Sequence, residues 1–285
     1  MSKVLGITCS YRRLGNCDVL LQEALLGARE AGAEVEYLRL TDLNIKPCRG
    51  CLSCAFKGSC AIKDDDMQLL RDKMKESDGL LIAAPTYVFS PAGIVKMVMD
   101  RSITGPDELN YYLGRRRAAA TISIAGNKEW NLLGLEILNL FPMAYGYDIV
   151  DYLEAFAPGP GETLLNDEVV AGAHQLGYSV VRAMEGKTEK KEPLPGQCPV
   201  CYSRAFRLSA PEEVRCCTCN TRGKVIPDKN SWKIDFNRED ISDHFWKISH
   251  RIKHLNEWII PTKDVYMKKR EAVKGSLQKY RDLKW

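Results

Sequence analysis

The sequence has little of what membrane-spanning, secreted or nucleic-acid-binding proteins require. It has no run of 18 or more apolar residues, so it predicts no transmembrane helix. Residues 1–7 run directly into a strand-like segment and lack the long apolar region and cleavage site of a signal peptide. A net charge of +4 over 285 residues does not by itself indicate nucleic acid. We therefore predict a globular cytoplasmic protein with no membrane partner.

Cysteine, by contrast, is plentiful and unevenly distributed. The chain has eleven cysteines, and disulfides are not expected in a reducing compartment. Four cysteines fall within residues 48–60 and five within residues 198–219, whereas Cys9 and Cys17 stand apart. Short, regular spacings of this kind in a cytosolic protein indicate metal ligands.

Strand-like and helix-like patterns alternate through residues 1–185. The expected strands cover residues 3–9, 34–40, 79–85, 118–125 and 148–156. The expected helices cover residues 18–31, 64–76, 91–101, 130–145 and 167–184. Five strand–helix units of this length predict an α/β fold with a doubly wound five-stranded parallel sheet. The strand order should be 2-1-3-4-5, with a ligand crevice at the carboxyl ends of strands 1, 3 and 4.

The remainder of the chain divides into three smaller parts. Residues 186–197 have the composition of a linker, residues 198–227 form a small cysteine-rich module, and residues 228–285 are expected to be a helical, basic tail. Residues 262–285 carry eight Lys or Arg against three Asp or Glu. We interpret this excess as a solvated helix face.

A polar loop follows the first expected strand, over residues 9–17. It lacks the Gly-x-Gly-x-x-Gly pattern, which disfavours a dinucleotide site. It does offer a hydroxyl, guanidinium groups, a glycine, an amide and the start of a helix, which together can hold one terminal phosphate. The candidate phosphate-binding residues are Ser10, Arg12, Gly15, Asn16 and Cys17.

This loop resembles the Gly-Ser-x-Arg-x-x-Gly-Asn-Thr motif of the NADPH-dependent FMN reductase family, which has a flavodoxin-like fold. Ser10, Arg12, Gly15 and Asn16 match that motif, and Cys17 replaces its threonine, which removes one phosphate hydroxyl. The resemblance covers residues 1 to about 185. It implies that the chain is flavodoxin-like and binds FMN.

A second segment, residues 85–91, resembles the family's Ser-Pro-x-Tyr loop, and the following Lys96, Asp100 and Arg101 resemble its Lys-x-x-x-Asp-Arg helix. In the family this loop lies against the isoalloxazine ring, where an aromatic side chain and backbone amides suit a flat polar group. A third contact is expected in the loop after the fourth strand. The residues implied to contact the cofactor in these two loops are Pro85, Thr86, Tyr87, Val88, Phe89, Ser123, Gly126 and Asn127.

The first cysteine group has the spacing C-x2-C-x2-C-x5-C. Four close thiolates suit a [4Fe-4S] cluster, in which each iron takes one thiolate. A single zinc could also bind four thiolates, although such sites more often use two separate knuckles. The segment resembles the compact motif of iron–sulfur flavoproteins, a branch of the same superfamily. That resemblance implies a [4Fe-4S] cluster on Cys48, Cys51, Cys54 and Cys60, with zinc, free thiols or no special role as alternatives.

The second cysteine group has the spacing C-x2-C-x14-C-x2-C. Two knuckles at this separation indicate one tetrahedral metal ion, held by Cys198, Cys201, Cys216 and Cys219 with Cys217 as a bystander. The knuckles resemble a zinc ribbon more than a rubredoxin, so we expect a structural zinc. Iron is the alternative, and it would make the module a one-electron relay.

These features together predict an FMN-dependent oxidoreductase. We expect electrons to pass between a one-electron carrier such as a ferredoxin, the [4Fe-4S] cluster, FMN and a small-molecule acceptor, with no side chain needed as an acid or base. The resemblance also implies a homodimer or homotetramer. One alternative is a cluster-free NAD(P)H-dependent FMN or quinone reductase. A second is a flavin redox sensor that binds nucleic acid or protein through the ribbon, which the lack of a dense basic and aromatic pattern disfavours.

Overall fold

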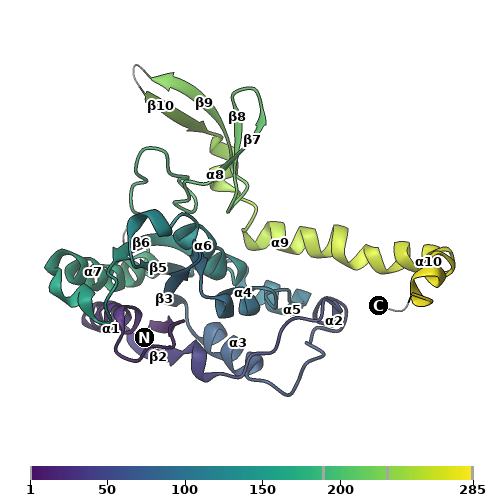
Figure 1. Ribbon diagram of the computed structural model, residues 1–285, viewed down its shortest axis with the longest axis horizontal. Helices are drawn as coiled ribbons and strands as arrows, with labels where there is room; N and C mark the ends of the chain where they lie inside the picture. The colour runs from purple at the N-terminus through teal and green to yellow at the C-terminus, as the bar shows by residue number, and fades with distance from the viewer. Residues whose placement is uncertain (1, 188–189, 229–230, 284–285) are drawn as a thin grey trace.

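The computed structural model describes residues 2–187, 190–228 and 231–283. Its larger part is built on a parallel sheet with the strand order β2-β1-β3-β5-β6 (Figure 1). The strands are β1 (Lys3–Thr8), β2 (Glu34–Arg39), β3 (Gly79–Tyr87), β5 (Ala118–Ala125) and β6 (Asp148–Phe156). A short strand, β4 (Ser90–Pro91), pairs antiparallel with the end of β3. This order confirms the predicted doubly wound α/β fold.

The central strands are apolar on both sides because helices cover both faces of the sheet. Alternate residues of one strand enter different cores: Leu80 and Ile82 belong to one, and Leu81 and Ala83 to the other. The helices α1 (Asn16–Glu30) and α7 (Asp167–Met184) cover one face. The other face is covered by α3 (Met67–Glu76), α4 (Gly93–Met99) and α6 (Gly134–Ala144). Shorter elements connect these units: η1 (Leu40–Asp42), α2 (Ser53–Lys57), α5 (Pro106–Tyr112), η2 (Lys128–Trp130) and η3 (Glu162–Leu165).

A second, antiparallel sheet follows with the order β10-β9-β8-β7. Its strands are β7 (Phe206–Ala210), β8 (Glu213–Cys216), β9 (Arg222–Asp228) and β10 (Ser231–Phe236). The last strand lies inside the region expected to be a helical tail, so the cysteine-rich module extends past residue 227. The ribbon is the pair of cysteine knuckles together with this sheet.

The segment expected to be a linker runs beside β6 and is fixed to it. Lys191 donates its backbone amide to the Val150 carbonyl over 2.9 Å. The Tyr202 hydroxyl donates to Val150 over 2.9 Å and to Lys191 over 2.7 Å. The knuckle cysteines are part of the same core as α3, α4 and α6. The ribbon is therefore docked on the larger domain and does not swing on a free linker.

The chain ends in helices α8 (Arg238–Ser242) and α9 (Ile248–His254), a π-helical turn η4 (Leu255–Ile259) and α10 (Ile260–Arg281). Residues of α9 and η4 still pack against α2 and α5, and α10 then continues as a long projection that leaves the body (Figure 1). We refer to residues 260–281 as the arm. None of the helices in the described residues combines the length and apolar character needed to cross a membrane.

Candidate functional site

A cleft of about 220 Å³ lies at the carboxyl ends of β1, β3, β5 and β6, where the predicted crevice was expected. Three of its walls come from the loops that the sequence singled out. The fourth comes from residues 157–160 after β6, which the sequence analysis missed, although the Pro158-Gly-Pro-Gly161 run marks a tight loop. The lining residues are Ser10, Arg12, Gly15, Asn16, Cys17, Pro85, Thr86, Tyr87, Ile124, Ala125, Gly126, Ala157, Pro158 and Pro160.

The first loop is held in shape by the buried Asp18 at the start of α1. Its carboxylate accepts hydrogen bonds from the Thr8 hydroxyl and the Leu14 amide, each over 2.9 Å. It also forms an ion pair with Arg39. Leu14 has a φ of 52°, a left-handed conformation that side chains seldom adopt. Asp18 thus stabilises a loop whose amides, with the start of α1, surround one end of the cleft.

Asn16 lines the cleft, but its side chain is engaged with the fourth loop. Its amide nitrogen donates to the carbonyls of Ala157 and Gly159, over 3.2 and 2.9 Å. Its oxygen accepts from the amide and the hydroxyl of Thr163, over 3.2 and 3.1 Å. Asn16 therefore braces two cleft loops against each other.

The second loop is a tight hairpin between β3 and β4. Val88 and Phe89, at its tip, have φ values of 50° and 67°. Two successive left-handed residues match the primed turns of short hairpins, where Asn and Gly are usual and a β-branched residue is strained. The Phe89 ring stacks on Trp130, with centroids 5.1 Å apart and planes 22° apart. Val88 and Phe89 lie outside the lining of the cleft, and the Phe89 ring joins the tip of this hairpin to η2.

The third loop is organised around Asn131, which is 5% exposed. Its side-chain oxygen accepts hydrogen bonds from the hydroxyls of Thr86 and Ser123, over 2.6 and 3.0 Å. A Cβ at Gly134 would lie 1.9 Å from that oxygen, so only glycine fits there. The side chain of Asn127 accepts from the Trp130 amide over 3.1 Å and caps η2. Of the three residues predicted here, Gly126 lines the cleft, whereas Ser123 and Asn127 support its wall.

A chain of hydrogen bonds continues from Asn131 to the ribbon. Asn131 donates to Glu154 over 3.0 Å, and Glu154 pairs with Arg204 over 3.1 Å. The Arg204 amide also donates to the carboxylate of Glu136, over 3.1 Å. Burial raises the pKa of Glu136, although the hydrogen bond from Arg204 opposes that shift. The ribbon is thus joined to the wall of the cleft by polar contacts that the sequence analysis did not identify.

The second cysteine group converges on one point. The Sγ atoms of Cys198, Cys201, Cys216 and Cys219 all lie within 4.8 Å of one another, and all four residues are buried. Two of the pairs, Cys198–Cys219 and Cys201–Cys216, are 3.4 Å apart. Metal–thiolate bonds of about 2.3 Å in a tetrahedron require sulfur atoms about 3.8 Å apart. The geometry suits a single tetrahedral ion, and Cys217 is exposed and outside the group.

The first cysteine group is arranged differently. Cys48, Cys51, Cys54 and Cys60 all line one small cavity of about 60 Å³. Among the described residues, however, only the ribbon cysteines gather closely enough to hold one ion. Cys48 and Cys51 are exposed, and Cys54 and Cys60 are partly buried. The four thiols therefore surround a common space at a wider spacing than a single ion requires.

Arg101 lines this second cavity and is itself held by buried contacts. Its guanidinium forms an ion pair with Asp65, and the two side chains are 3% and 1% exposed. It also donates to the Cys60 sulfur over 3.3 Å and to the Lys46 carbonyl over 3.1 Å. Burial raises the pKa of the Cys60 thiol, but hydrogen bonds from the Ile62 amide and Arg101 outweigh it, and the pKa is lowered. A lowered thiol pKa favours the thiolate that a metal requires.

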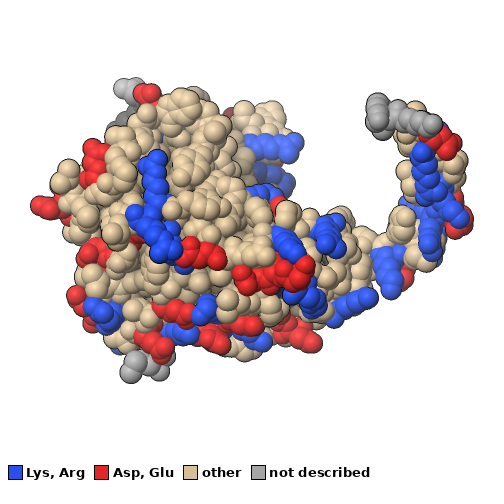
Figure 2. All heavy atoms as spheres, turned by 60° about the horizontal axis from the view of Figure 1, so that its bottom comes forward, with Lys and Arg blue, Asp and Glu red and all other residues tan. Residues whose placement is uncertain are grey.

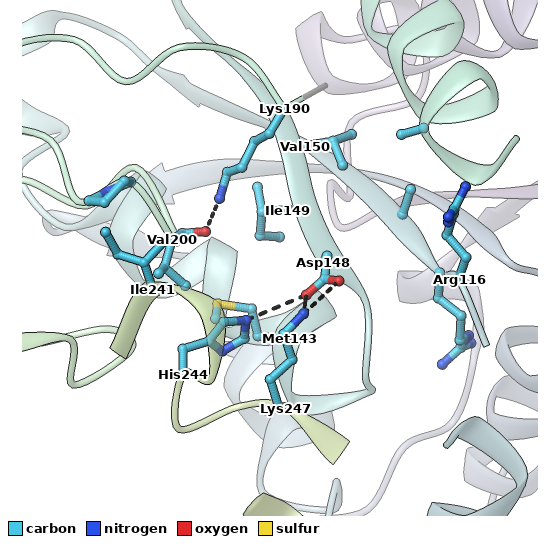
Figure 3. A pocket seen from close by; sticks show the side chains of 14 residues that line it. Arg116, Met143, Asp148, Ile149, Val150, Lys190, Val200, Ile241, His244 and Lys247 are labelled. Carbon is cyan, nitrogen blue, oxygen red and sulfur yellow. Dashed lines mark hydrogen bonds and ion pairs between the residues drawn. The ribbon is translucent and has the colours of Figure 1, made fainter. Parts of the chain in front are cut away.

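A third cavity, of about 310 Å³, lies at the opposite, amino edge of the sheet (Figure 3). Asp148 accepts hydrogen bonds from Lys247, both over 3.1 Å, and lies 3.5 Å from His244. Burial raises the pKa of Asp148, but His244 and Lys247 outweigh it and lower the pKa to about 2. Lys190 donates to the Val200 carbonyl on the far side of the cavity. The Asp148 contacts attach the segment between α8 and α9 to the sheet, and the Lys190 contact joins the linker to the ribbon, away from the cleft.

Comparisons with known proteins agree with the cleft and the cysteine loop. The family described as NADPH-dependent FMN reductase matches residues 2–130. An iron–sulfur flavoprotein of Archaeoglobus fulgidus is 32% identical over 186 residues, which cover 65% of this chain and 81% of that protein. One from Methanocaldococcus jannaschii is 36% identical over 127 residues. That second match covers 45% of this chain and less than two thirds of the relative, 64%.

Longer matches include the ribbon and the tail. A flavone synthase of Aspergillus candidus is 25% identical over 274 residues, covering 85% of this chain and 84% of its own. A solved structure titled flavone reductase superposes with a TM-score of 0.78 at 25% identity, over 99% of this chain and 98% of that one. Taken with the cleft, the four-cysteine loop and the match across most of the Archaeoglobus protein, these comparisons show that the chain belongs to the iron–sulfur flavoprotein family of flavin oxidoreductases.

Proposed function

We propose that this protein is an FMN-dependent reductase that passes electrons from a one-electron carrier, through a [4Fe-4S] cluster and FMN, to a planar small-molecule acceptor. The observation that carries the proposal is the cleft, in which a polar end and an aromatic side meet at the carboxyl edge of the sheet. Bound FMN would supply both one- and two-electron chemistry. The protein's own task is to bind, orient and shield.

The residues of the cleft fit FMN. The Ser10 hydroxyl, Arg12 and the amides at the start of α1 offer the donors that a phosphate needs. Pro85, Tyr87 and Gly126 form the opposite part of the lining, where a flat ring could stack and hydrogen-bond to the backbone. The sole thiol in the lining, Cys17, has its pKa raised to about 12 by burial, so it stays a neutral packing group.

The wide spacing of the first cysteine group supports a cluster over a single zinc. In a cubane each thiolate binds a different iron, so the thiolates must stand farther apart than around one ion. Cys48, Cys51, Cys54 and Cys60 surround a shared cavity without converging.

The experiment is to purify the protein without oxygen and measure FMN, iron, sulfide and zinc per chain. About one FMN, four iron, four sulfide and one zinc per chain would support the proposal. FMN and zinc without sulfide would instead leave a cluster-free NAD(P)H-dependent reductase.

The acceptor is proposed to be a planar conjugated molecule of the flavonoid or quinone type. Trp130, which is 55% exposed and stacked on Phe89, offers a stacking surface near the cleft loops, and two relatives are named for flavones. Saturating the C=C bond of a flavone, or reducing a quinone to its hydroquinone, consumes two electrons and two protons. The electrons are proposed to come from a ferredoxin-like carrier or from NAD(P)H.

Steady-state reduction of flavone under anaerobic conditions tests this role. Trp130→Ala should raise the KM for flavone about tenfold, because one aromatic stacking contact is lost. Trp232→Ala removes an exposed tryptophan of the ribbon and is the matched control. An unchanged KM in Trp130→Ala would remove the stacking surface from the proposal.

We also propose, from the family resemblance, that the protein is a homodimer or homotetramer.

A further inference from the structure

The arm is a long helix that meets the body near its base, where the Lys263 ammonium lies 6.0 Å from the centroid of the Phe56 ring. The turn η4 just before the arm belongs to a small core in which Leu255 and Ile259 meet Ala55 and Leu109. Beyond that core, the 22 residues of α10, all described, include none that is buried. A helix of that length extends about 33 Å. Figure 2 shows the arm curving away so that a wide hollow separates it from the body.

The accessible surface of the chain is too large for a compact monomer. The structure exposes 15822 Å². A folded monomer of 32.1 kDa is expected to expose about 12,300 Å². The excess is larger than the roughly 800 Å² that each partner contributes to an interface of standard size. The projecting parts of the chain therefore have enough surface to form a stable interface.

One face of the arm carries apolar side chains at helical spacing. Starting from the buried Ile259, every seventh residue is apolar: Tyr266, Val273 and Tyr280. Leu277 lies on the same face, four residues after Val273. Tyr266, Leu277 and Tyr280 are 53%, 42% and 57% exposed. The face that Ile259 buries at the base thus continues outward with no surface beneath it.

Such a helix requires a partner, because isolated helices are marginal in water and gain most of their stability from packing an apolar face. The body of the same chain cannot supply it, since α9, η4 and α10 run on without a break and carry the arm outward (Figure 1). A second chain in the hollow of Figure 2 can reach the arm.

The charges favour another copy of this chain. Residues 262–285 carry a net +5, whereas the rest of the chain has 33 basic and 34 acidic residues. Figure 2 shows acidic side chains spread over the body, whereas the charged side chains of the arm are mostly basic. The body also exposes apolar side chains that could receive the arm, including Phe156, Leu132 and Leu165 at 39%, 64% and 86%. Large aromatic and apolar groups of this kind indicate a protein partner.

We propose that the arm is a clasp, and that its Tyr266–Tyr280 face packs against a second copy of this chain, which returns the same contact. The proposal names the contacting segment, and it rests on the geometry of the arm and not on the chemistry of the cleft. It can therefore fail while the redox function stands, and the reverse is also true.

The test uses the full-length protein with its cofactors, in sedimentation equilibrium over a range of concentrations. Tyr266→Asp combined with Leu277→Asp should raise the dimer dissociation constant about 100-fold or more. Lys268 lies on the opposite face of the same helix, so Lys268→Asp should leave the dimer dissociation constant unchanged. This control changes the charge at its position by two units, more than either Tyr266→Asp or Leu277→Asp does. Flavin content and circular dichroism establish that each variant is folded, which is expected because no residue of the arm is buried.

Hydrogen exchange supplies a second measurement. Amides of residues 260–281 should be protected in the wild type at high concentration and should exchange freely in the double variant. A monomeric wild type, or a dimer that the double variant leaves intact, would overturn the proposal. So would a monomer that dimerises only when nucleic acid is added, because the basic side of the arm would then be the contact surface.

Discussion

The two cysteine groups teach different lessons about how a metal site is built. The ribbon cysteines are buried, lie within 4.8 Å of one another and belong to the main core. The cysteines of residues 48–60 surround a small cavity, and the buried Arg101–Asp65 pair supports them. The first arrangement would make a bound metal part of the folded core. The second leaves Cys48 and Cys51 exposed to solvent.

The largest expected effect separates the two groups by stability. Cys201→Ser should remove the ribbon metal and lower the free energy of unfolding by about 4 kcal/mol, because the knuckles pack in the main core. Urea unfolding and zinc content measure this. Cys217→Ser, at an exposed position outside the group, should change neither. If Cys201→Ser keeps its zinc and its stability, the ribbon is not a structural site.

Arg101→Ala should lower the free energy of unfolding by about 3 kcal/mol, slightly less than Cys201→Ser, because it leaves the buried Asp65 carboxylate without its partner. The support of the cysteine cavity is then lost, and iron content should fall with stability. Lys96→Ala, in α4 just before Arg101, is the control, since the pair of Lys96 with Asp100 is exposed and worth less than about 0.5 kcal/mol. Equal losses in the two variants would show that the buried pair does not support the loop.

A pH dependence should mark the attachment of the ribbon and tail. The pKa of Asp148 is lowered to about 2 by His244 and Lys247, which outweigh its burial. A lowered pKa contributes stability above the unfolded value near 4, and that contribution is lost as the pH falls toward 2. Because the side chain is 56% exposed, we expect only about 1 kcal/mol after solvent screening.

Unfolding measured from pH 6 to pH 2.5 tests this expectation. Asp148→Asn should flatten the part of the profile below pH 4, whereas Glu271→Gln on the arm should leave it unchanged. A profile that Asp148→Asn does not alter would assign the acid sensitivity to other carboxyl groups.

The smallest effect on stability is expected at the first cysteine group. Cys51→Ser should abolish the iron and sulfide signal while it changes the free energy of unfolding by less than about 1 kcal/mol, because Cys51 is exposed. Ser53→Ala is the neighbouring control. FMN should remain bound in both variants. A collapse of the fold in Cys51→Ser would remove the contrast with the ribbon.

Local patterns in the sequence were enough for the larger domain. The strands at residues 118–125 and 148–156 and the helix at 167–184 match the structure, because burial on both faces and helical spacing leave a clear periodic record. The convergence of Cys198, Cys201, Cys216 and Cys219 was also predictable, since each knuckle is a local turn. The strand β10, in contrast, lies where a helical tail was expected.

The cleft residues show where local reasoning stops. Ser10, Arg12, Thr86 and Gly126 were predicted and line the cleft, but Ser123 and Asn127 support its wall. Nothing in their neighbouring residues distinguishes these roles. Asn131, which organises that wall, was not predicted, because its partners Thr86 and Glu154 are distant in sequence.

The sequence alone determined the α/β alternation, the place of the polar loop after β1 and the two groups of closely spaced cysteines, because each depends on residues a few positions apart. Only the tertiary structure decided which polar groups face the cleft, that the ribbon docks on β6, and that the arm leaves the body without a surface to cover. These features depend on contacts between distant segments. Side-chain direction and packing partners are set by the whole fold, and no local pattern records them.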